Sequence, residues 1–322
     1  MQKRVSMGDV AAVAGVSAQT VSRVVNASPR VDPATRVRVE EAMASLGYQV
    51  NRTARALRTG RFHTIGLVVE TLASVGNSRM LEAIALAAAA DGYALTVVTA
   101  VGRDAVADGF ARLHDQGVDG AIVLNEASAL ARGVSLPGGL ALVVVDSPPD
   151  DRYTVVQTDH AQGARLATAH LLDAGHDTVW HLAGPADSYA AVERERGWRE
   201  ALTGAGAHVP PVLRGSWTAA SGHVAAAELP HEATALFVAN DQMALGALRA
   251  LAEAGRDVPG AVAVVGFDDV VDAADYRPPL TTVRQDFDAL GAAAVRALVA
   301  AIEGAEPTVE TLVPTLVRRA SA

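Results

Sequence analysis

The sequence predicts a small all-α head that contains a helix-turn-helix, then a hinge helix, and then a large α/β body. Three observations predict this fold class. Two short helical segments flank a glycine turn near the N-terminus, basic charge gathers in the first 61 residues, and apolar runs alternate with helical stretches from Phe62 onward. A chain of 322 residues, of which 50% are hydrophobic, is long enough for two or three domains.

The segment from Val10 to Asn26 has the pattern of two helices joined by a tight turn at Gly15. A helix-turn-helix of this kind places its second helix in the major groove of DNA, although an ordinary helical hairpin has the same pattern. Ser17 is a suitable N-cap for the second helix. Four side chains are expected to face outward near the start of that helix, where base edges would be met: Ala18, Gln19, Ser22 and Arg23.

The charge of the chain is distributed unevenly. The first 61 residues carry ten basic and four acidic side chains, a balance of +6, whereas the whole chain has a formal charge of −9, which leaves −15 for the remainder. A basic head on an acidic body suits phosphate binding at one end and solubility at the other. A solvated charge run is the alternative, and it explains less well why the arginines follow a helix-turn-helix.

The rest of the head indicates a third helix and a short hinge. Asp32 followed by Pro33 marks a helix start, and Gly47 stands where that helix would end. Residues 51–61 suit a further helix of about two turns, which is marginal in water without a partner. We therefore expect a hinge that becomes helical when it is docked. Its Leu57 could either enter the minor groove between base steps or pack on the adjacent domain.

Continuous apolar runs in the body predict strands that are buried on both faces of a sheet. The runs are Ile65–Val69, Ala94–Val98, Ala121–Leu124, Ala141–Val145, Thr178–Leu182, Ala235–Ala239 and Ala261–Val265. Helical segments lie between several of them, including Arg79–Ala90, His160–Leu172, Ala191–Leu202 and Gln242–Glu253. This alternation predicts parallel sheets covered by helices, and the body is long enough for two sheets with a cleft between them.

Polar side chains follow several of these runs, at the strand ends where ligands bind in open α/β sheets. They are Glu70, Asp146, Asn240, Asp241, Asp268 and Asp269. Carboxylates and amides at these positions can bond vicinal hydroxyls, while Arg194 could add donors and Trp217 a flat apolar face for a sugar ring. Asp and Asn after a strand also serve as helix caps, so one member of the Asn240–Asp241 pair could be structural.

Other function classes find little support in the sequence. There is no cysteine, the nine histidines are not grouped at ligand spacings, and no G-x-S-x-G, H-E-x-x-H or G-x-G-x-x-G motif occurs. We therefore expect no catalytic residues, no metal and no cofactor. No apolar run is long enough to span a membrane and no signal-peptide core follows the N-terminus, so a cytoplasmic protein is expected. A periplasmic sugar-binding protein would need a signal peptide in place of the basic head, and a nucleoid-type DNA binder would not need a polar cleft.

Several segments together carry a family resemblance. They are Asp9–Asn26, Val31–Gly60, His181–Pro185, Arg194–Trp198, Val238–Ala247, Val264–Asp269 and Pro278–Phe287. Over essentially its whole length the chain resembles the lactose-repressor (LacI) family of bacterial regulators, and within that family the lactose-repressor subgroup.

The resemblance implies a domain organisation. Residues 1–50 would form the three-helix DNA-binding head, 51–61 the hinge helix and linker, and 62–322 a body of two subdomains like periplasmic sugar-binding proteins. The chain would cross between the subdomains three times. One subdomain would then combine 62–158 with 286–313, and the other 159–285 with 314–322.

The resemblance also implies partners and site residues. A homodimer would bind palindromic double-stranded operator DNA, without contact with a membrane, and a small sugar inducer would release it. The residues expected at DNA are Ser17, Ala18, Gln19, Thr20, Ser22, Arg23, Asn26, Arg30, Asn51, Ala54 and Leu57. The inducer, of the galactoside type, would be held by Arg194, Asn240 and Asp268, and the pocket would be completed by Glu70, Ser74, Asp146, Trp217, Gln285 and Phe287.

Four positions depart from the lactose-repressor subgroup. Ala18 replaces an aromatic residue, so a different operator sequence is expected. Glu70 and Ser74 replace a small polar and an aliphatic residue, and Thr158 replaces an aromatic one, so a different sugar, or a purine or phosphorylated effector, remains an alternative. The chain stops at Ala322 without the subgroup's leucine-heptad tail, which predicts a dimer rather than a tetramer.

Overall fold

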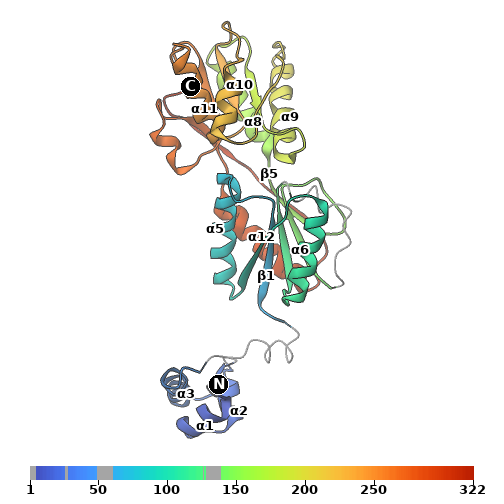
Figure 1. Ribbon diagram of the computed structural model, residues 1–322, viewed down its shortest axis with the longest axis vertical. Coiled ribbons are helices and arrows are strands. Elements are labelled where there is room, and N and C mark those ends of the chain that lie inside the picture. Colours follow the sequence, from blue (N-terminus) through green and yellow to red (C-terminus); the bar gives the residue numbers. More distant parts are fainter. Residues whose placement is uncertain (1–4, 26–27, 49–60, 126, 128–138) are drawn as a thin grey trace. The chain divides into compact units, whose positions relative to one another are not determined.

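The computed structural model describes residues 5–25, 28–48, 61–125, 127 and 139–322, and these form two compact units (Figure 1). One unit ends at Phe62 and the other begins at His63. The expected hinge helix at 51–61 lies, apart from Arg61, outside the described residues. So do four of the residues expected at DNA, namely Asn26, Asn51, Ala54 and Leu57.

The first unit contains the three helices that the sequence predicts. They are α1 (Met7–Ala14), α2 (Ala18–Val25) and α3 (Pro33–Ser45). A capping box starts α1, because Ser6 Oγ accepts a hydrogen bond from the Asp9 amide and Asp9 Oδ2 accepts one from the Ser6 amide. Reciprocal bonds of this kind satisfy amides that the first turn of a helix leaves without partners.

Local sequence signals determine the turns of the head. Gly15 ends α1 with a φ of +65°, a left-handed conformation that glycine adopts at low cost. The predicted caps are confirmed, since Ser17 Oγ accepts the Thr20 amide at 3.2 Å and Asp32 Oδ2 accepts the Thr35 amide at 3.0 Å. The three helices enclose one small apolar core, formed by Val10, Ala11, Ala14, Val21, Val24, Val31, Val39 and Ala42.

The second unit contains two six-stranded sheets, as the alternation of strands and helices predicts. Sheet A has the order β11-β5-β4-β3-β1-β2 and is parallel throughout. Its strands are β1 (Thr64–Val69), β2 (Ala94–Thr99), β3 (Gly120–Leu124), β4 (Ala141–Val145), β5 (Thr154–Thr158) and β11 (Val309–Leu312).

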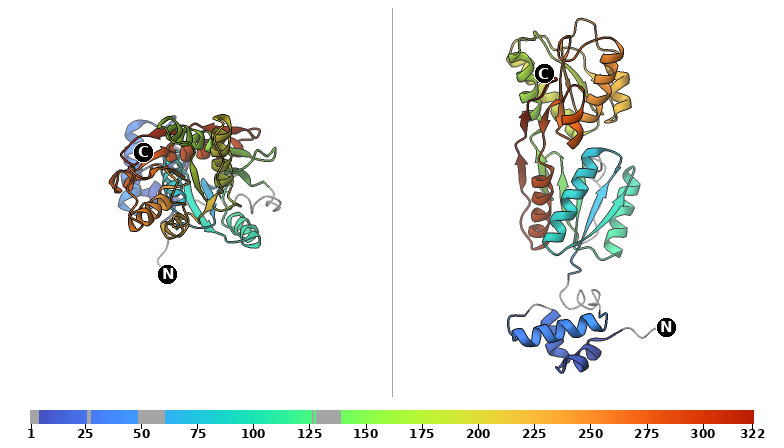
Figure 2. Two further views of the ribbon diagram at one scale, coloured as in Figure 1. Left: turned by 90° about the horizontal axis from the view of Figure 1, so that it is seen from above. Right: turned by 90° about the vertical axis from the view of Figure 1, so that its left-hand side faces the viewer.

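Helices cover both faces of sheet A. On one face α5 (Val75–Ala90) lies beside α12 (Phe287–Ile302), and on the other lies α6 (Arg103–Asp115) (Figures 1 and 2). Ile65 and Leu67 of β1 pack with the first pair, whereas Val68 packs with α6. Alternate residues of one strand thus enter two different cores, which is why the strand sequence is apolar without interruption.

Sheet B has the order β12-β10-β9-β8-β6-β7, and only its edge strand β12 is antiparallel to its neighbour. Its strands are β6 (Trp180–Ala183), β7 (Leu213–Arg214), β8 (Ala235–Val238), β9 (Ala263–Asp268), β10 (Thr281–Arg284) and β12 (Thr315–Val317). The helices α8 (His160–Asp173) and α9 (Tyr189–Gly204) cover one face, and α10 (Ala219–Ala226) and α11 (Asp241–Glu253) cover the other. A short 3-10 helix, η1 (Val271–Asp275), follows β9.

The chain crosses between the two sheets three times. It passes from β5 into α8 at Asp159, from β10 into α12 at Gln285 and Asp286, and from β11 into β12 at residues 313–314. We call sheet A with α5, α6 and α12 subdomain 1, and sheet B with α8 to α11 subdomain 2. The strands differ from the predicted apolar runs at two places that matter for function. Strand β9 extends beyond its predicted run to Asp268, and no apolar run predicted the short strand β10, which leads into the second crossing.

None of the helices in the described part of the chain combines the length and the apolar character needed to cross a membrane.

His181 on β6 predicts a loss of stability in mild acid. The side chain is fully buried between Phe237 and Trp198, and burial lowers its pKa from 6.5 to about 4. The unfolded chain therefore binds a proton between pH 6.5 and 4 that the folded chain does not, so stability present above pH 6.5 should fall by about 3 kcal/mol as the pH drops to 4.

Urea unfolding of the wild type and of His181→Asn at several pH values measures this effect. Asparagine can still donate to the Phe237 carbonyl but does not titrate, so its stability should depend less on pH over this range. Identical pH slopes for the two proteins would contradict the assignment to His181.

Candidate functional site

The first unit presents the second helix of the helix-turn-helix to solvent. Ala18, Gln19 and Arg23 on α2 are exposed, while Val21 and Val24 on the opposite side are buried in the head core. Thr20 and Ser22 are half-buried, Ser17 is used as the helix cap, and Arg30 is exposed in the turn before α3. The outward side of α2 is therefore small and polar with one cation, as a helix that enters a DNA groove requires.

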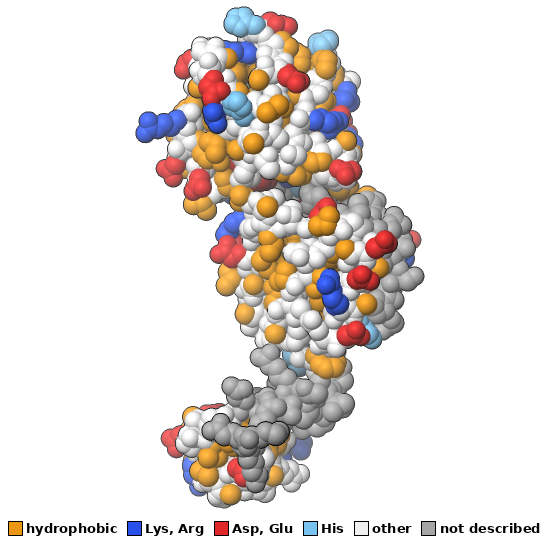
Figure 3. Space-filling view, in the orientation of Figure 1, with side chains coloured by type: hydrophobic (Ala, Val, Ile, Leu, Met, Phe, Trp, Pro, Cys, Tyr) orange, Lys and Arg blue, Asp and Glu red, His pale blue; other side chains and the backbone are white. Residues whose placement is uncertain are grey.

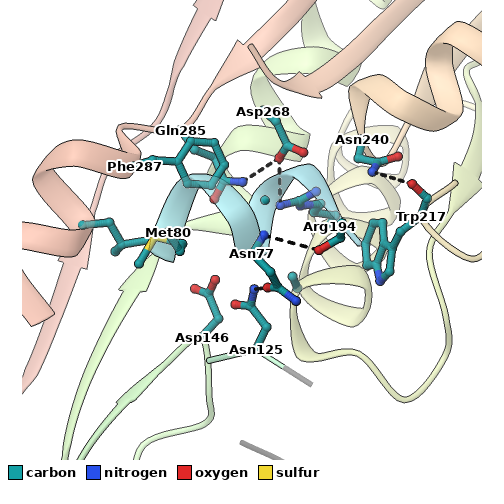
Figure 4. A pocket seen from close by; sticks show the side chains of 14 residues that line it. Asn77, Met80, Asn125, Asp146, Arg194, Trp217, Asn240, Asp268, Gln285 and Phe287 are labelled. Atoms are coloured by element: carbon teal, nitrogen blue, oxygen red, sulfur yellow. Dashed lines mark hydrogen bonds and ion pairs between the residues drawn. The ribbon is translucent and has the colours of Figure 1, made fainter. Parts of the chain in front are cut away.

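The second unit contains a pocket whose walls come from both subdomains (Figure 4). The pocket is lined by Ser74, Gly76, Asn77, Met80, Asn125, Asp146, Ala190, Arg194, Trp217, Asn240, Asp268, Gln285, Phe287 and Leu290. Most of the polar members stand at or just after the carboxyl ends of parallel strands, where open α/β sheets bind ligands.

Arg194 on α9 is the one cationic side chain that lines this pocket in the described structure, and it is almost fully buried. Its guanidinium carbon lies 3.8 Å from the centre of the Phe267 ring, and its NH1 group donates to the carbonyl of Ala239. NH2 lies 3.5 Å from Oδ1 of Asp268. A buried charge requires partners of this kind, and the carbonyl, the carboxylate and the aromatic face together supply them.

Asp268 is held at the end of β9 by neighbours on both sides. Gln285 Nε2, from the second crossing, donates to Asp268 Oδ1 at 2.6 Å (Figure 4). Burial raises the pKa of Asp268, while the charge of Arg194 and the bond from Gln285 oppose that rise. Residues from α9, β9 and the crossing thus form one polar group that faces the pocket.

Asn240 and Asp241, which follow β8, have different roles. Asn240 lines the pocket and also caps α11, because its Oδ1 accepts the Met243 amide at 3.0 Å and its Nδ2 donates to the Trp217 carbonyl. Asp241 is buried behind the pocket, where it accepts bonds from the Thr282 hydroxyl and the Val270 amide. Burial, strengthened by the charge of Asp268, raises the pKa of Asp241 well above its usual range.

The opposite wall, in subdomain 1, carries amide groups. Asn77 on α5 is buried, and its Nδ2 donates to the Thr71 carbonyl at 2.9 Å while its Oδ1 accepts from Asn125. In the described structure Oδ1 of Asn125 and Nε1 of Trp217 are buried without a hydrogen-bond partner. A buried polar atom without a partner is costly, so this pocket offers an acceptor and a donor that a ligand would satisfy.

Backbone strain is concentrated in this pocket. Four of its non-glycine residues have a positive φ, namely Asn125 (44°), Asp146 (53°), Trp217 (67°) and Asp268 (118°). Such conformations cost about 1–3 kcal/mol each and gather at sites where the surrounding structure holds a side chain in place. The backbone thus directs these polar and aromatic side chains toward a common space.

Eight of the nine residues that the sequence suggests for effector binding line the pocket, and Glu70 does not. Glu70 comes two residues after Val68, and residues two apart along a strand point to the same face of the sheet. Val68 packs toward α6, whereas the pocket is bordered by α5 on the other face. Six other lining residues were not predicted from the sequence, namely Gly76, Asn77, Met80, Asn125, Ala190 and Leu290. Asn125 directly follows the apolar run of β3, so the rule that identified Asp146 after β4 would also have identified it.

A helix-turn-helix unit followed by a two-subdomain body with a polar pocket defines a class of protein, the ligand-responsive DNA-binding regulators. Two family models match the chain accordingly. Residues 6–51 match the model of bacterial regulatory proteins of the lacI family, and residues 168–322 match a periplasmic binding protein-like domain.

Curated and solved proteins agree with these matches. The chain is 39% identical to the lactose operon repressor of Escherichia coli over 98% of its own length and 90% of that protein, and 38% identical to the regulator CelR of Thermobifida fusca over 94% and 93%. A crystal structure of the Lac repressor dimer bound to operator and an anti-inducer has a TM-score of 0.85 at 35% identity, with 99% of both chains covered. A CelR–cellobiose complex has a TM-score of 0.74 at 34% identity, and covers 99% of this chain and all of that one.

The chain therefore belongs to the LacI family of bacterial regulatory proteins. Like its relatives, it is a DNA-binding transcriptional repressor of that family and not an enzyme.

The Trp217 ring packs directly against the backbone of Gly184, where no side chain stands in its way. A Cβ atom at Gly184 would lie 2.3 Å from Cη2 of Trp217, so Gly184→Ala should displace the indole and destabilise the protein by about 1–3 kcal/mol. Near-ultraviolet circular dichroism and urea unfolding measure both effects. Gly204→Ala at the end of α9, where a Cβ meets nothing within 4 Å, is the control. An unchanged aromatic spectrum in Gly184→Ala would show that the ring is not fixed there.

Proposed function

We propose that the chain is a dimeric repressor that leaves a palindromic operator when a neutral sugar, of the galactoside class, enters the pocket between its subdomains. One observation supports the sugar most directly, namely the lining of the pocket. Asp146 and Asp268 offer acceptors, Arg194 and Gln285 offer donors, and Trp217 adds a flat apolar surface beside Arg194. The hydroxyl groups of a sugar both donate and accept hydrogen bonds, so they match these polar side chains, and the apolar face of a sugar ring matches the Trp217 ring.

The charge of the pocket favours a neutral effector over a phosphorylated one. Its described lining contains two carboxylates and one guanidinium, and that guanidinium already lies against Asp268 and the Ala239 carbonyl. An added phosphate would meet more negative than positive charge.

Among sugars, the galactoside proposal rests on similarity to the lactose operon repressor. The similarity to a CelR–cellobiose complex supports a different disaccharide almost as well, and the ribose operon repressor of Escherichia coli is 32% identical over 98% of the chain. Lactose and other galactosides, cellobiose and ribose are therefore the sugars to compare.

We propose that α2 contacts base edges in the operator through Ala18, Gln19 and Arg23, which are its exposed side chains. Ser17, Thr20, Ser22 and Arg30 flank them and would reach the sugar–phosphate backbone, which fixes the orientation of a recognition helix. Two heads on a two-fold axis match an inverted repeat of half-sites.

Exposed apolar side chains on the body support the dimer. Leu86 on α5 is 67% exposed, Val224 on α10 is 64% exposed and Leu245 on α11 is 44% exposed. Figure 3 shows hydrophobic side chains at the surface over α5, on the same face as α10 and α11 in Figure 1. Large apolar side chains gathered on one face are typical of surfaces that another chain covers.

We propose that the sugar acts by shifting a population between two dimer states. One state sets the heads at the spacing of the operator, and the other binds the sugar more tightly. A ligand moves such an equilibrium only through its differential affinity, and a hundredfold difference corresponds to about 2.7 kcal/mol of coupling. By reciprocity, operator DNA must weaken sugar binding by the same factor.

A thermal-shift screen of mono- and disaccharides, followed by gel shifts on DNA from the neighbouring promoter, tests this function. A sugar that binds the folded state raises its melting temperature and should also release the DNA. If a purine or a phosphorylated metabolite releases the DNA and no neutral sugar does, the sugar proposal is wrong and the repressor assignment stands.

Arg23→Ala should weaken specific operator binding by about 1–3 kcal/mol if Arg23 contacts a base edge. Binding to random DNA should change much less, and sugar affinity of the free protein should be unchanged. Gel shifts and calorimetry measure these quantities. Arg112→Ala on α6 removes the same charge from the second unit and is the control. Equal losses on operator and random DNA would indicate that Arg23 contacts only phosphate.

Asp268→Asn should reduce sugar affinity by about tenfold to a hundredfold, because a buried hydroxyl group of the ligand would lose its charged acceptor. The variant should still fold and bind operator, so that DNA is retained when sugar is added. Calorimetry and sugar-dependent gel shifts measure this, with the exposed Asp272→Asn on η1 as the control. Wild-type sugar affinity in Asp268→Asn would remove this residue from the pocket assignment.

A further inference from the structure

His160 is a buried histidine that lies between the two walls of the pocket without lining it. It is the first residue of α8, directly after the first crossing between the subdomains, and its side chain is 1% exposed. Its ring contacts Phe267 and Tyr189, with ring centres 6.0 and 6.5 Å away. Neither the strand pattern nor any metal-ligand spacing singles it out in the sequence.

The two ring nitrogens of His160 face groups of opposite character. Nδ1 lies 3.3 Å from both Nε and NH2 of Arg194. A guanidinium has only donors, so Nδ1 must carry the lone pair and the ring proton must be on Nε2. Nε2 in turn lies 2.9 Å from Oδ1 of Asp146, although it is not aligned there as a hydrogen bond.

These contacts join groups from both subdomains into one buried chain. Asp146 follows β4 of sheet A, and its Oδ1 also accepts the Thr158 amide at 3.2 Å. His160 stands at the first crossing, Arg194 and Asp268 belong to subdomain 2, and Gln285 stands at the second crossing. A rotation of one subdomain against the other must therefore change the distance from Asp146 to His160, while the contact from His160 to Arg194 stays within subdomain 2.

We propose that His160 is a positioning residue that couples Arg194 to Asp146 and so transmits effector binding from subdomain 2 to subdomain 1. Its Nδ1 holds the guanidinium in place for the ligand, and its Nε2–H aligns with Asp146 in one of the two subdomain arrangements. This inference rests on the proposed function as a repressor that a sugar releases from DNA. It assigns Nδ1 of His160 to sugar affinity and Nε2 to the coupling between sugar binding and operator binding.

Two substitutions separate these halves. His160→Asn keeps an acceptor near the position of Nδ1 but does not reach Asp146, whereas His160→Gln keeps an amide near the position of Nε2 but leaves Arg194 without its acceptor. We expect His160→Asn to retain sugar affinity and to lose about tenfold in the ratio of operator affinities without and with saturating sugar. We expect His160→Gln to lose about tenfold in sugar affinity, measured by calorimetry on the free protein.

The control is His170→Asn, the same substitution farther along α8, which should leave both quantities unchanged. A merely structural histidine would make the Asn and Gln variants alike, both less stable and with no division between affinity and coupling. Equal effects of the two variants on both quantities would therefore overturn the proposal.

A ligand-free measurement keeps the inference separate from the proposed function. Nitrogen-15 spectra of histidine-labelled wild-type protein, with the His160 signal identified from its loss in His160→Asn, report which ring nitrogen carries the proton. A proton on Nε2 is expected, and a proton on Nδ1 would overturn the proposal even if a sugar releases the DNA. If no sugar releases the wild type, the proposed function fails and the Nε2 proton still supports His160 as the group that positions Arg194.

Discussion

The burial of one guanidinium is the constraint on which the rest of this pocket depends. Arg194 leaves water almost completely, and a charge in the interior is tolerated only where partners replace the lost hydration. The partners come from separate places in the chain: the Ala239 carbonyl after β8, Asp268 at the end of β9, and the Phe267 ring beside it. Packing α9 against sheet B therefore also fixes the strand ends that face the ligand.

The two walls of the pocket differ in chemistry. Subdomain 2 supplies the charged and aromatic groups around Arg194, whereas subdomain 1 supplies amides on α5 and after β3, Asp146, and the apolar side chains of Met80, Phe287 and Leu290. At the crossings, His160 accepts from Arg194 and Gln285 donates to Asp268, both in subdomain 2, while Nε2 of His160 lies 2.9 Å from Asp146 of subdomain 1. A ligand with hydroxyl groups around a ring can contact both walls at once, and its affinity then depends on how far the subdomains are closed. Sensitivity of ligand binding to subdomain rotation follows from the architecture itself.

Rigid and strained features meet at the same strand ends. Parallel sheets with helices on both faces form rigid cores, and the left-handed backbone at Asp146, Trp217 and Asp268 is held by those cores. Strain of this kind would relax in a loosely packed protein, so the pocket is preorganised at a cost in stability. The first unit has a much smaller core, which suffices for three helices with strong caps. Its α2 presents exposed side chains without need of a deep pocket.

Local patterns in the sequence determined the elements of the head, the class of the body and most of the polar groups in the pocket. Caps such as Ser17 and Asp32 depend on neighbours within three residues, and buried strands such as β4 depend on continuous apolar runs, so both are visible in one dimension. The tertiary structure alone decided which polar side chains meet. The parity of β1 turned Glu70 away from the pocket, the crossing after β10 brought Gln285 to Asp268, and the start of α8 placed His160 between Asp146 and Arg194. Contacts of this kind join residues far apart in the chain, and no periodicity within a single element encodes them.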